Sequence, residues 1–252
     1  MQIDLSTWLT LEVYRALLVF VRIGAAFMTL PGYGDPSVPA RVRILAALAT
    51  AIAVAPAIHG LPDQVPGAGP MFLAIAAEAF AGALLGTLSR TVISGVLVAG
   101  QVIGQNIGLS NVFMTGLASD QAAAVGAAIY AGLLALMFVT DAHHLVLRAL
   151  VGSYRLLPAG QFPDTGDSAK SVVAAGVRAF RLGGQLALPF LLLGLVFNIS
   201  LAAVNRAMHS LPVFMLGGPL IVLAGLYLLA AAIPGALDQG LAAFADTAAL
   251  LR

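Results

Sequence analysis

The chain contains no cysteine and very little charge. None of its 252 residues is Cys, and only 9% are Asp, Glu, Lys or Arg. Without cysteine, disulfides, thiolate metal sites and cysteine nucleophiles are excluded. A soluble domain carries about 25% charged residues, so the charge content excludes an ordinary soluble protein. The 12 basic and 11 acidic residues give a formal net charge of +1, which predicts no nucleic-acid partner.

Motifs of catalysis and of secretion are also missing. The sequence has no GxSxG, no HExxH, no paired-carboxylate motif and no phosphate-cradling loop, so we expect neither an enzyme nor a bound cofactor. Its first residues, Met1–Asp4, lack the basic region of a cleaved signal peptide. We therefore expect the first apolar segment to act as an uncleaved membrane anchor.

Hydrophobic residues dominate what is present. They make up 60% of the chain, and the mean hydropathy is +0.99. A helix needs about 20 apolar residues to cross a bilayer, and charge-free runs of about that length or longer lie at 44–62, 91–119, 121–140, 182–205 and 207–237. The sequence predicts an all-α, polytopic membrane protein of kinked helical hairpins, with roughly six hydrophobic helices. We expect residues 1–252 to form a single membrane-embedded domain.

Several expected helices have unusual lengths. Residues 71–107 contain no turn signal, and one helix of that length would span about 55 Å, too long for an upright crossing. The segment 44–58 is short for a span. Pro189 and Pro219 interrupt apolar runs, where proline kinks a helix. These features indicate a bundle whose geometry is decided by neighbouring helices rather than by lipid.

Three segments are more polar or more regular than the rest. Residues 155–170 are expected to form a polar loop, after which Asp167 or Ser168 caps the next helix. Residues 31–39 form a second loop, stiffened by three prolines. Apolar residues at helical spacing predict a short amphipathic helix over 236–251 that meets an interface or a partner. The five basic and three acidic residues of 141–181 favour a cytoplasmic position for that stretch.

Residues 100–119, GQVIGQNIGLSNVFMTGLAS, carry no charge but many glycines and amides. A solvated loop would carry charge, and a lipid-facing helix would carry fewer glycines and amides. This composition suits a segment enclosed by other polypeptides. Gly100, Gly104 and Gly108 recur at four-residue spacing, and Gly82 and Gly86 form a second such pair. Glycines at this spacing share one face of a helix. They allow close packing, either within the chain or against another subunit. Gln101 and Gln105 either hydrogen-bond across helices or line a wet lumen.

Arg22, Glu78 and Arg206 lie within or beside apolar runs, where each must pair or reach water. One acidic residue within the spans is too few for a proton relay, so an intramembrane salt bridge or an interface contact is favoured.

Asp141, His143 and His144 have side chains of the kinds that bind metal ions. Adjacent histidines on a helix diverge by about 100°, and two ligands do not make a zinc site, so we expect no metal here.

Several of these segments, taken in order, resemble the FliR family of flagellar type III export-gate membrane proteins and its injectisome counterparts. The resemblance covers nearly the whole chain and is most specific at Thr140–Leu145, Ser153–Arg155 and Pro158–Gly160. The residues that carry it are Arg22, Pro31, Pro39, Arg43, Asp141, His143, His144, Ser153, Tyr154, Pro158, Pro189, Arg206, Phe214 and Pro219.

The resemblance implies a non-enzymatic subunit of a bacterial inner-membrane export gate in the flagellar basal body. Its implied partners are multiple copies of two smaller subunits, FliP-like and FliQ-like, an FlhB-like export switch protein, unfolded secretion substrates and the lipid membrane. The resemblance also implies that residues 109–119 plug the pore from inside. The plug residues would be Leu109, Ser110, Asn111, Val112, Phe113, Met114, Thr115, Gly116 and Leu117.

Three alternatives stay open at this point. A secondary transporter for a small solute would bind at mid-membrane, around Glu78 or around helices broken at Pro189 and Pro219. An injectisome subunit would serve virulence secretion instead of the flagellum. A pure assembly scaffold would take no part in the pore.

Overall fold

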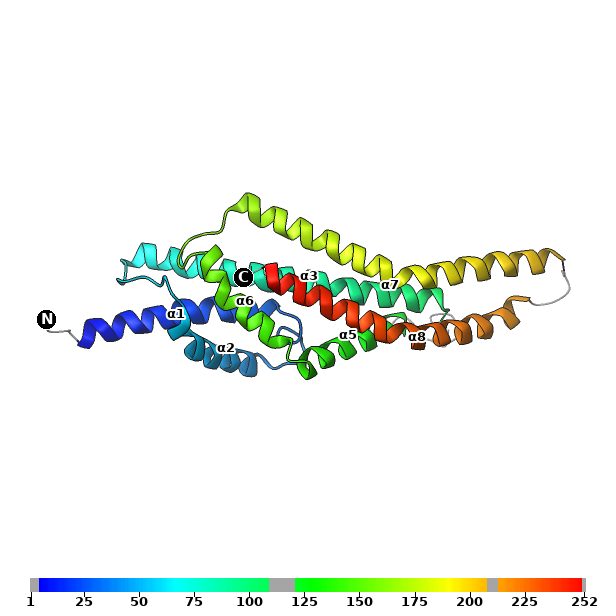
Figure 1. The fold of residues 1–252 in the computed structure, drawn as a ribbon, viewed down its shortest axis with the longest axis horizontal. Coiled ribbons are helices and arrows are strands. Elements are labelled where there is room, and N and C mark those ends of the chain that lie inside the picture. The colour runs from blue at the N-terminus through cyan, green and yellow to red at the C-terminus, as the bar shows by residue number, and fades with distance from the viewer. Residues whose placement is uncertain (1–4, 109–120, 208–212, 251–252) are drawn as a thin grey trace. The chain divides into compact units, whose positions relative to one another are not determined.

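The computed structural model describes residues 5–108, 121–207 and 213–250. Within these ranges the chain forms seven α-helices and one short 3-10 helix, with no β-strand (Figure 1). The predicted all-α fold is confirmed. The helices are α1 (Leu5–Thr29), α2 (Ala40–Val54), α3 (Ala68–Asn106), α5 (Gln121–Val139), α6 (His143–Leu156), α7 (Thr165–Ala207) and α8 (Val213–Leu250), and the 3-10 helix η1 is Ala55–Ala57.

Four helical stretches are long and apolar enough to cross a membrane: Ala40–Ala57, Ala68–Asn106, Thr165–Ala207 and Gly217–Ala249. The pair α5 and α6 counts as a fifth if it is one broken span. By length, α1 would also reach across, but it carries Glu12, Arg15 and Arg22. The chain is therefore a polytopic membrane protein, as the hydropathy pattern predicts.

The described chain divides into two compact units. The first contains residues 5–91, 141–175 and 244–250, and the second contains 92–140 and 176–243, leaving aside the positions that are not described. Helices α3, α7 and α8 contribute residues to both units.

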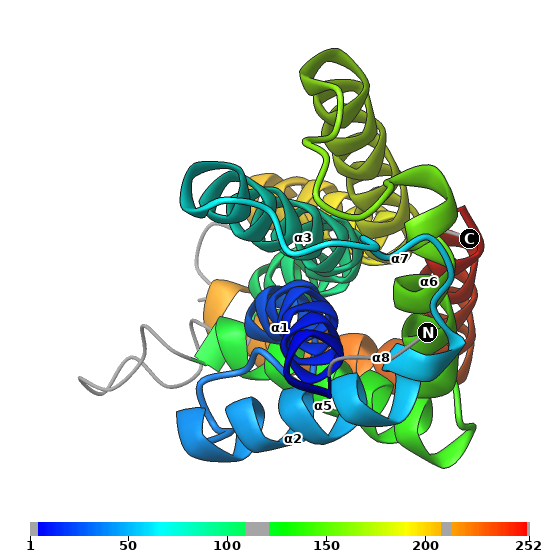
Figure 2. The same cartoon turned by 90° about the vertical axis from the view of Figure 1, so that its left-hand side faces the viewer.

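In the first unit, α1 contacts α2, α3 and α6. Figure 2 shows α1 beside α2 and the first part of α3. Leu18 and Tyr14 are buried against Ala74 of α3, with Met71 and Ile75 packed around them. Apolar residues repeat along one side of α1 at helical spacing, which is why this helix buries a continuous face despite its three charged residues.

The second unit depends on close backbone approaches. A Cβ at Gly95 would collide with the carbonyl of Ala179 on α7, and one at Gly183 would meet the carbonyl oxygen of Gly95 at 2.9 Å. Gly225 of α8 likewise lies directly against Ile107, just after α3. Small residues allow this spacing, and such packing is what holds helices together where lipid gives no hydrophobic drive.

Helix boundaries agree with the sequence-based expectations in part. The long helix is confirmed, because α3 runs unbroken for 39 residues. Helices α7 and α8 continue through Pro189 and Pro219, so neither proline divides its helix, and a kink at these positions stays a prediction. Proline removes one backbone hydrogen bond, a loss that the long apolar helices on both sides of it tolerate.

The expected separate amphipathic helix at 236–251 is wrong in the described part. Residues up to Leu250 are the final turns of α8. Phe244 and Ala248 are buried, and Ala248 lies beside Val146 and Leu150 of α6 in the first unit. The apolar spacing that suggested an external interface therefore serves packing within the chain.

The polar loop is shorter than the expected range 155–170, because α6 extends to Leu156 and α7 begins at Thr165. The predicted caps, Asp167 and Ser168, both lie inside α7. Asp164 caps the helix instead, since its Oδ1 accepts a hydrogen bond of 2.9 Å from the backbone N–H of Asp167.

Candidate functional site

The buried charges of the first unit form one connected cluster. Arg22 of α1 donates from Nε to Oε2 of Glu78 on α3 at 2.7 Å, and from Nη2 to Oε1 at 3.1 Å. Both side chains have no exposed surface. The two parallel hydrogen bonds make a bidentate pair, the strongest arrangement available to arginine and a carboxylate. Of the two uses expected for these charges, Arg22 and Glu78 show the salt bridge, buried within the chain; its depth in the membrane stays a prediction.

Helix α6 and the turn after it complete this cluster. Nη1 of Arg22 donates to Oγ of Ser153 at 3.2 Å, and Nη2 donates to the carbonyl oxygen of Leu157 at 3.0 Å. The guanidinium carbon lies 3.7 Å from the centre of the Tyr154 ring, which adds a cation–π contact. The backbone N–H of Gly160 donates to Oε1 of Glu78 at 2.7 Å, and the Tyr154 hydroxyl donates to Oε2 at 3.3 Å.

Each carboxylate oxygen of Glu78 therefore accepts two hydrogen bonds, and all three guanidinium nitrogens of Arg22 donate. A buried ion pair repays its desolvation only when it is satisfied to this degree. Sequence reasoning identified four of these side chains but missed the backbone groups of Leu157 and Gly160. The turn signal at Pro158–Gly160 was the available clue, and Gly160 has φ +74°, which favours glycine.

The glycine pair on α3 belongs to the same helix contact. Gly82 follows Glu78 by one turn, and a Cβ there would collide with the carbonyl oxygen of Arg22. Gly86, another turn on, lies directly against the Thr29 side chain. On the face of α3 that carries Glu78, Gly82 and Gly86 have no side chain, which lets α1 approach the α3 backbone closely.

The loop 31–39 is held by both flanking helices. Arg43 of α2 donates from Nη2 to the carbonyl oxygens of Asp35 and Val38 at 2.9 and 3.1 Å. The Tyr33 ring stacks on Phe27 of α1 with 4.4 Å between ring centres. Burial raises the pKa of the Tyr33 phenol. Pro31 is buried, and Pro39 stands at the N-cap of α2.

The glycine and amide residues at the end of α3 face different directions. Gly100 contacts Gly126 of α5 so closely that a Cβ would meet its backbone, and Gly104 is buried. Packing within the chain thus accounts for Gly100. Gly108 ends the helix with φ +76°. The side chains of Gln101 and Gln105 are exposed on the chain, so they are placed to meet water or another subunit.

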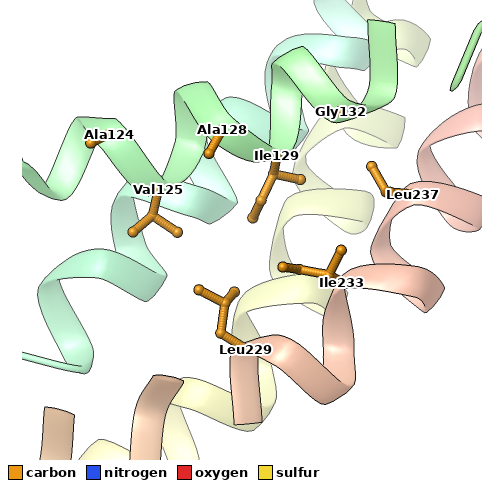
Figure 3. Close-up of a pocket in the computed structure, with 8 residues that line it drawn as sticks. All are labelled: Ala124, Val125, Ala128, Ile129, Gly132, Leu229, Ile233 and Leu237. Atoms are coloured by element: carbon orange, nitrogen blue, oxygen red, sulfur yellow. The ribbon is translucent and has the colours of Figure 1, made fainter. Parts of the chain in front are cut away.

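An apolar groove lies between α5 and α8 in the second unit. Its volume is about 410 Å³. Figure 3 shows Val125 and Ile129 of α5 facing Leu229 and Ile233 of α8 across it. The remaining lining residues are Ala124, Ala128, Gly132 and Leu237, so no charged side chain enters the groove.

Large apolar side chains also stand exposed on the long helices. Phe180 of α7 is 86% exposed, and Tyr227 of α8 is 80% exposed. Exposed apolar surface of this kind marks contact with lipid or with another protein.

The turn before α6 departs from the sequence-based expectation. The donor atoms of Asp141, His143 and His144 all lie within 4.8 Å of one another, and the two imidazole rings are 4.2 Å apart. The expected divergence of the two adjacent histidines is therefore wrong for their rings. They stand in the first turn of α6, where the chain has just turned and both rings swing to the same side.

The other predicted site residues are scattered. Pro158 opens the turn after α6, and Arg206 is exposed in the last turn of α7. Phe214 belongs to the first turn of α8. The predicted plug, residues 109–119, lies outside the described residues, so its residues Leu109 to Leu117 stay a prediction.

An all-helical chain with several membrane-length helices and a buried, fully bonded ion pair is a polytopic membrane protein. It belongs to the family described as "Bacterial export proteins, family 1", which matches residues 13–247. It is 34% identical over 226 residues to the flagellar biosynthetic protein FliR of Caulobacter vibrioides, covering 89% of this chain and 90% of that protein. The FliR protein of Escherichia coli K12 is 31% identical, with 90% and 86% covered. That of Bacillus subtilis is 34% identical, with 81% and 80% covered.

Proposed function

We propose that this chain is a subunit of the flagellar protein export gate in the bacterial inner membrane. It acts without catalysis, as a single membrane-embedded domain, and forms part of a pore for unfolded flagellar proteins. Its partners are several copies of FliP-like and FliQ-like subunits and an FlhB-like export switch protein. The observation that carries the proposal is the family match across residues 13–247, together with flagellar relatives that align over most of their length.

Exposed apolar surface supports an assembled state. The charge-free groove between α5 and α8 and the protruding Phe180 and Tyr227 offer contact area on several helices. The exposed amides of Gln101 and Gln105 lie on the same chain. Amides are poorly suited to lipid, and they hydrogen-bond well to another polypeptide or to water in a lumen.

We also propose that residues 109–119 close the pore. The segment is apolar and carries no charge. The helices that flank it, α3 and α5, are in close backbone contact at Gly100 and Gly126. Small side chains among the apolar ones keep each contact weak, which suits a closure that must open for every substrate.

Replacing residues 109–119 by a Gly/Ser linker of equal length is therefore expected to let ions leak across the membrane. The linker removes the apolar side chains that exclude water while preserving chain length. The measurement is membrane conductance and secretion in cells that contain the complete export apparatus. A permuted segment with the same eleven residues is the matched control, and we expect it to leak less than the linker. Unchanged conductance together with normal secretion in the linker variant would contradict the closure.

A small-solute transporter is less well supported. A site around Glu78 would need its carboxylate free for a substrate or a coupling ion, and Glu78 already accepts four hydrogen bonds from Arg22, Tyr154 and Gly160. A site at broken helices is not favoured either, since α7 and α8 continue through Pro189 and Pro219. The flagellar system is preferred over virulence secretion because the relatives reported above are named for flagellar biosynthesis.

A further inference from the structure

The turn between α5 and α6 and the first turn of α6 bring together side chains that bind metals. Asp141, His143 and His144 each offer one ligand atom, and these atoms lie within 4.8 Å of one another. Two imidazoles and a carboxylate are a common ligand set for divalent zinc and its neighbours. We propose that these three residues form a binding site for one divalent transition-metal ion, with Zn²⁺ as the best match.

The distances fit a site that closes by small side-chain rotations. Zinc binds histidine nitrogen at about 2.0–2.1 Å and carboxylate oxygen at about 2.0–2.2 Å, so tetrahedral ligand atoms lie roughly 3.3 Å apart. Nδ1 of His144 is already 3.7 Å from Oδ1 of Asp141. Asp141 and His144 are exposed and free to turn, while His143 is half-buried and provides the fixed point. Three protein ligands leave the fourth position to water.

The backbone fixes the position from which the Asp141 side chain leaves the chain. Asp141 has φ +58°, and no other non-glycine residue of the described chain has a positive φ. Its carbonyl oxygen accepts from the N–H of His144 at 3.0 Å, and the carbonyl of Ala142 accepts from Leu145 at 3.0 Å. In this tight turn the Asp141 side chain lies beside the first two residues of α6, His143 and His144. A left-handed conformation in a non-glycine residue is strained and is often retained for a function.

The site does not depend on the proposed pore. Its three residues lie in the first unit, at the start of α6 and in the turn before it, and none of them takes part in the Arg22–Glu78 cluster. Loss of metal binding and loss of export are therefore separate results.

The test uses the full-length chain in detergent, purified through a tag that contains no histidine. The chain has four histidines, so a His59→Gln/His209→Gln background leaves only His143 and His144. Zn²⁺ binding is measured by calorimetry, and Co²⁺ serves as a coloured probe of ligand type and coordination number. We expect one ion per chain and a visible Co²⁺ spectrum of a four-coordinate site. Asp141→Asn, His143→Gln and His144→Gln should each weaken binding by more than about tenfold.

Two controls separate a specific site from surface binding. Asp238→Asn, an exposed carboxylate of α8, should leave the affinity unchanged. The triple variant Asp141→Asn/His143→Gln/His144→Gln should bind no Co²⁺ with a four-coordinate spectrum, and its helical content should equal that of the parent because two of the three side chains are exposed. Equal binding by the triple variant and its parent, or only an adventitious ion with an octahedral aqueous-type spectrum in the parent, would overturn the proposal.

Discussion

Glu78→Gln is expected to lower the free energy of unfolding by about 3–5 kcal/mol, the usual effect of removing one partner of a buried ion pair. The change keeps the size of the side chain but leaves the Arg22 guanidinium charged, fully buried and without a counterion. It also alters the acceptor that holds Gly160 and Tyr154. We expect the variant to accumulate poorly in membranes and to unfold at a clearly lower temperature in detergent.

Glu12→Gln is the matched control for Glu78→Gln. Glu12 pairs with Arg15 at 2.8 Å on the same helix as Arg22, but its side chain is 42% exposed. A surface pair of this kind contributes about 0–1 kcal/mol, so the control should behave almost like the parent. If the free energy of unfolding falls equally in both variants, the cluster does not stabilise the packing of α1, α3 and α6 as its geometry indicates.

Gly82→Val is expected to have the second large effect. A Cβ at this position would overlap the backbone carbonyl oxygen of Arg22 and would lie 3.1 Å from Cβ of Ala25. A backbone group cannot rotate away, so α1 must move off α3 and the Arg22–Glu78 hydrogen bonds one turn away must stretch. Overpacking usually lowers the free energy of unfolding by about 1–3 kcal/mol. Because Gly82→Val also disturbs the ion pair, we expect its loss to reach or exceed the upper end of that range.

The thermal unfolding midpoint in detergent measures the effect of Gly82→Val, and Gly24→Val is its control. Gly24 lies inside α1, with open space where its Cβ would be. Both changes replace glycine by valine within a helix, which favours helix slightly, so propensity alone predicts no loss in either. A midpoint for Gly82→Val equal to that of Gly24→Val would show that α1 and α3 do not approach as closely as described.

Much of the fold follows from local sequence properties. Charge-free runs of membrane length predict helices, and the missing turn signal near Arg90 predicts the unbroken α3. The pairing of Arg22 with Glu78 is also predictable, because few charges lie within apolar runs and each needs a partner. Their remaining partners are not, since Ser153 lies 131 residues from Arg22 and only tertiary packing brings them together.

The errors have local causes. Dense polar residues favour a cap of α7 at Asp167 or Ser168, whereas Asp164, which directly precedes the helix, accepts from the N–H of Asp167 in its first turn. The expected divergence of His143 and His144 describes the directions of their Cα–Cβ bonds, whereas rotation about the side-chain bonds brings the two rings to 4.2 Å. The apolar spacing near Phe244 was assigned to a partner because spacing shows that a face is buried, but not which surface buries it.

We expect other protein subunits, rather than lipid alone, to cover the exposed apolar faces of the long helices. Site-specific photo-crosslinking from Phe180 and Tyr227, in cells that contain the whole export apparatus, measures this, with the buried Phe190 as the control position. Crosslinks from at least one of the two exposed positions should reach smaller membrane proteins of the FliP-like or FliQ-like kind, and position 190 should give none to other proteins. Adducts with lipid only, from both exposed positions, would show that lipid alone covers these faces.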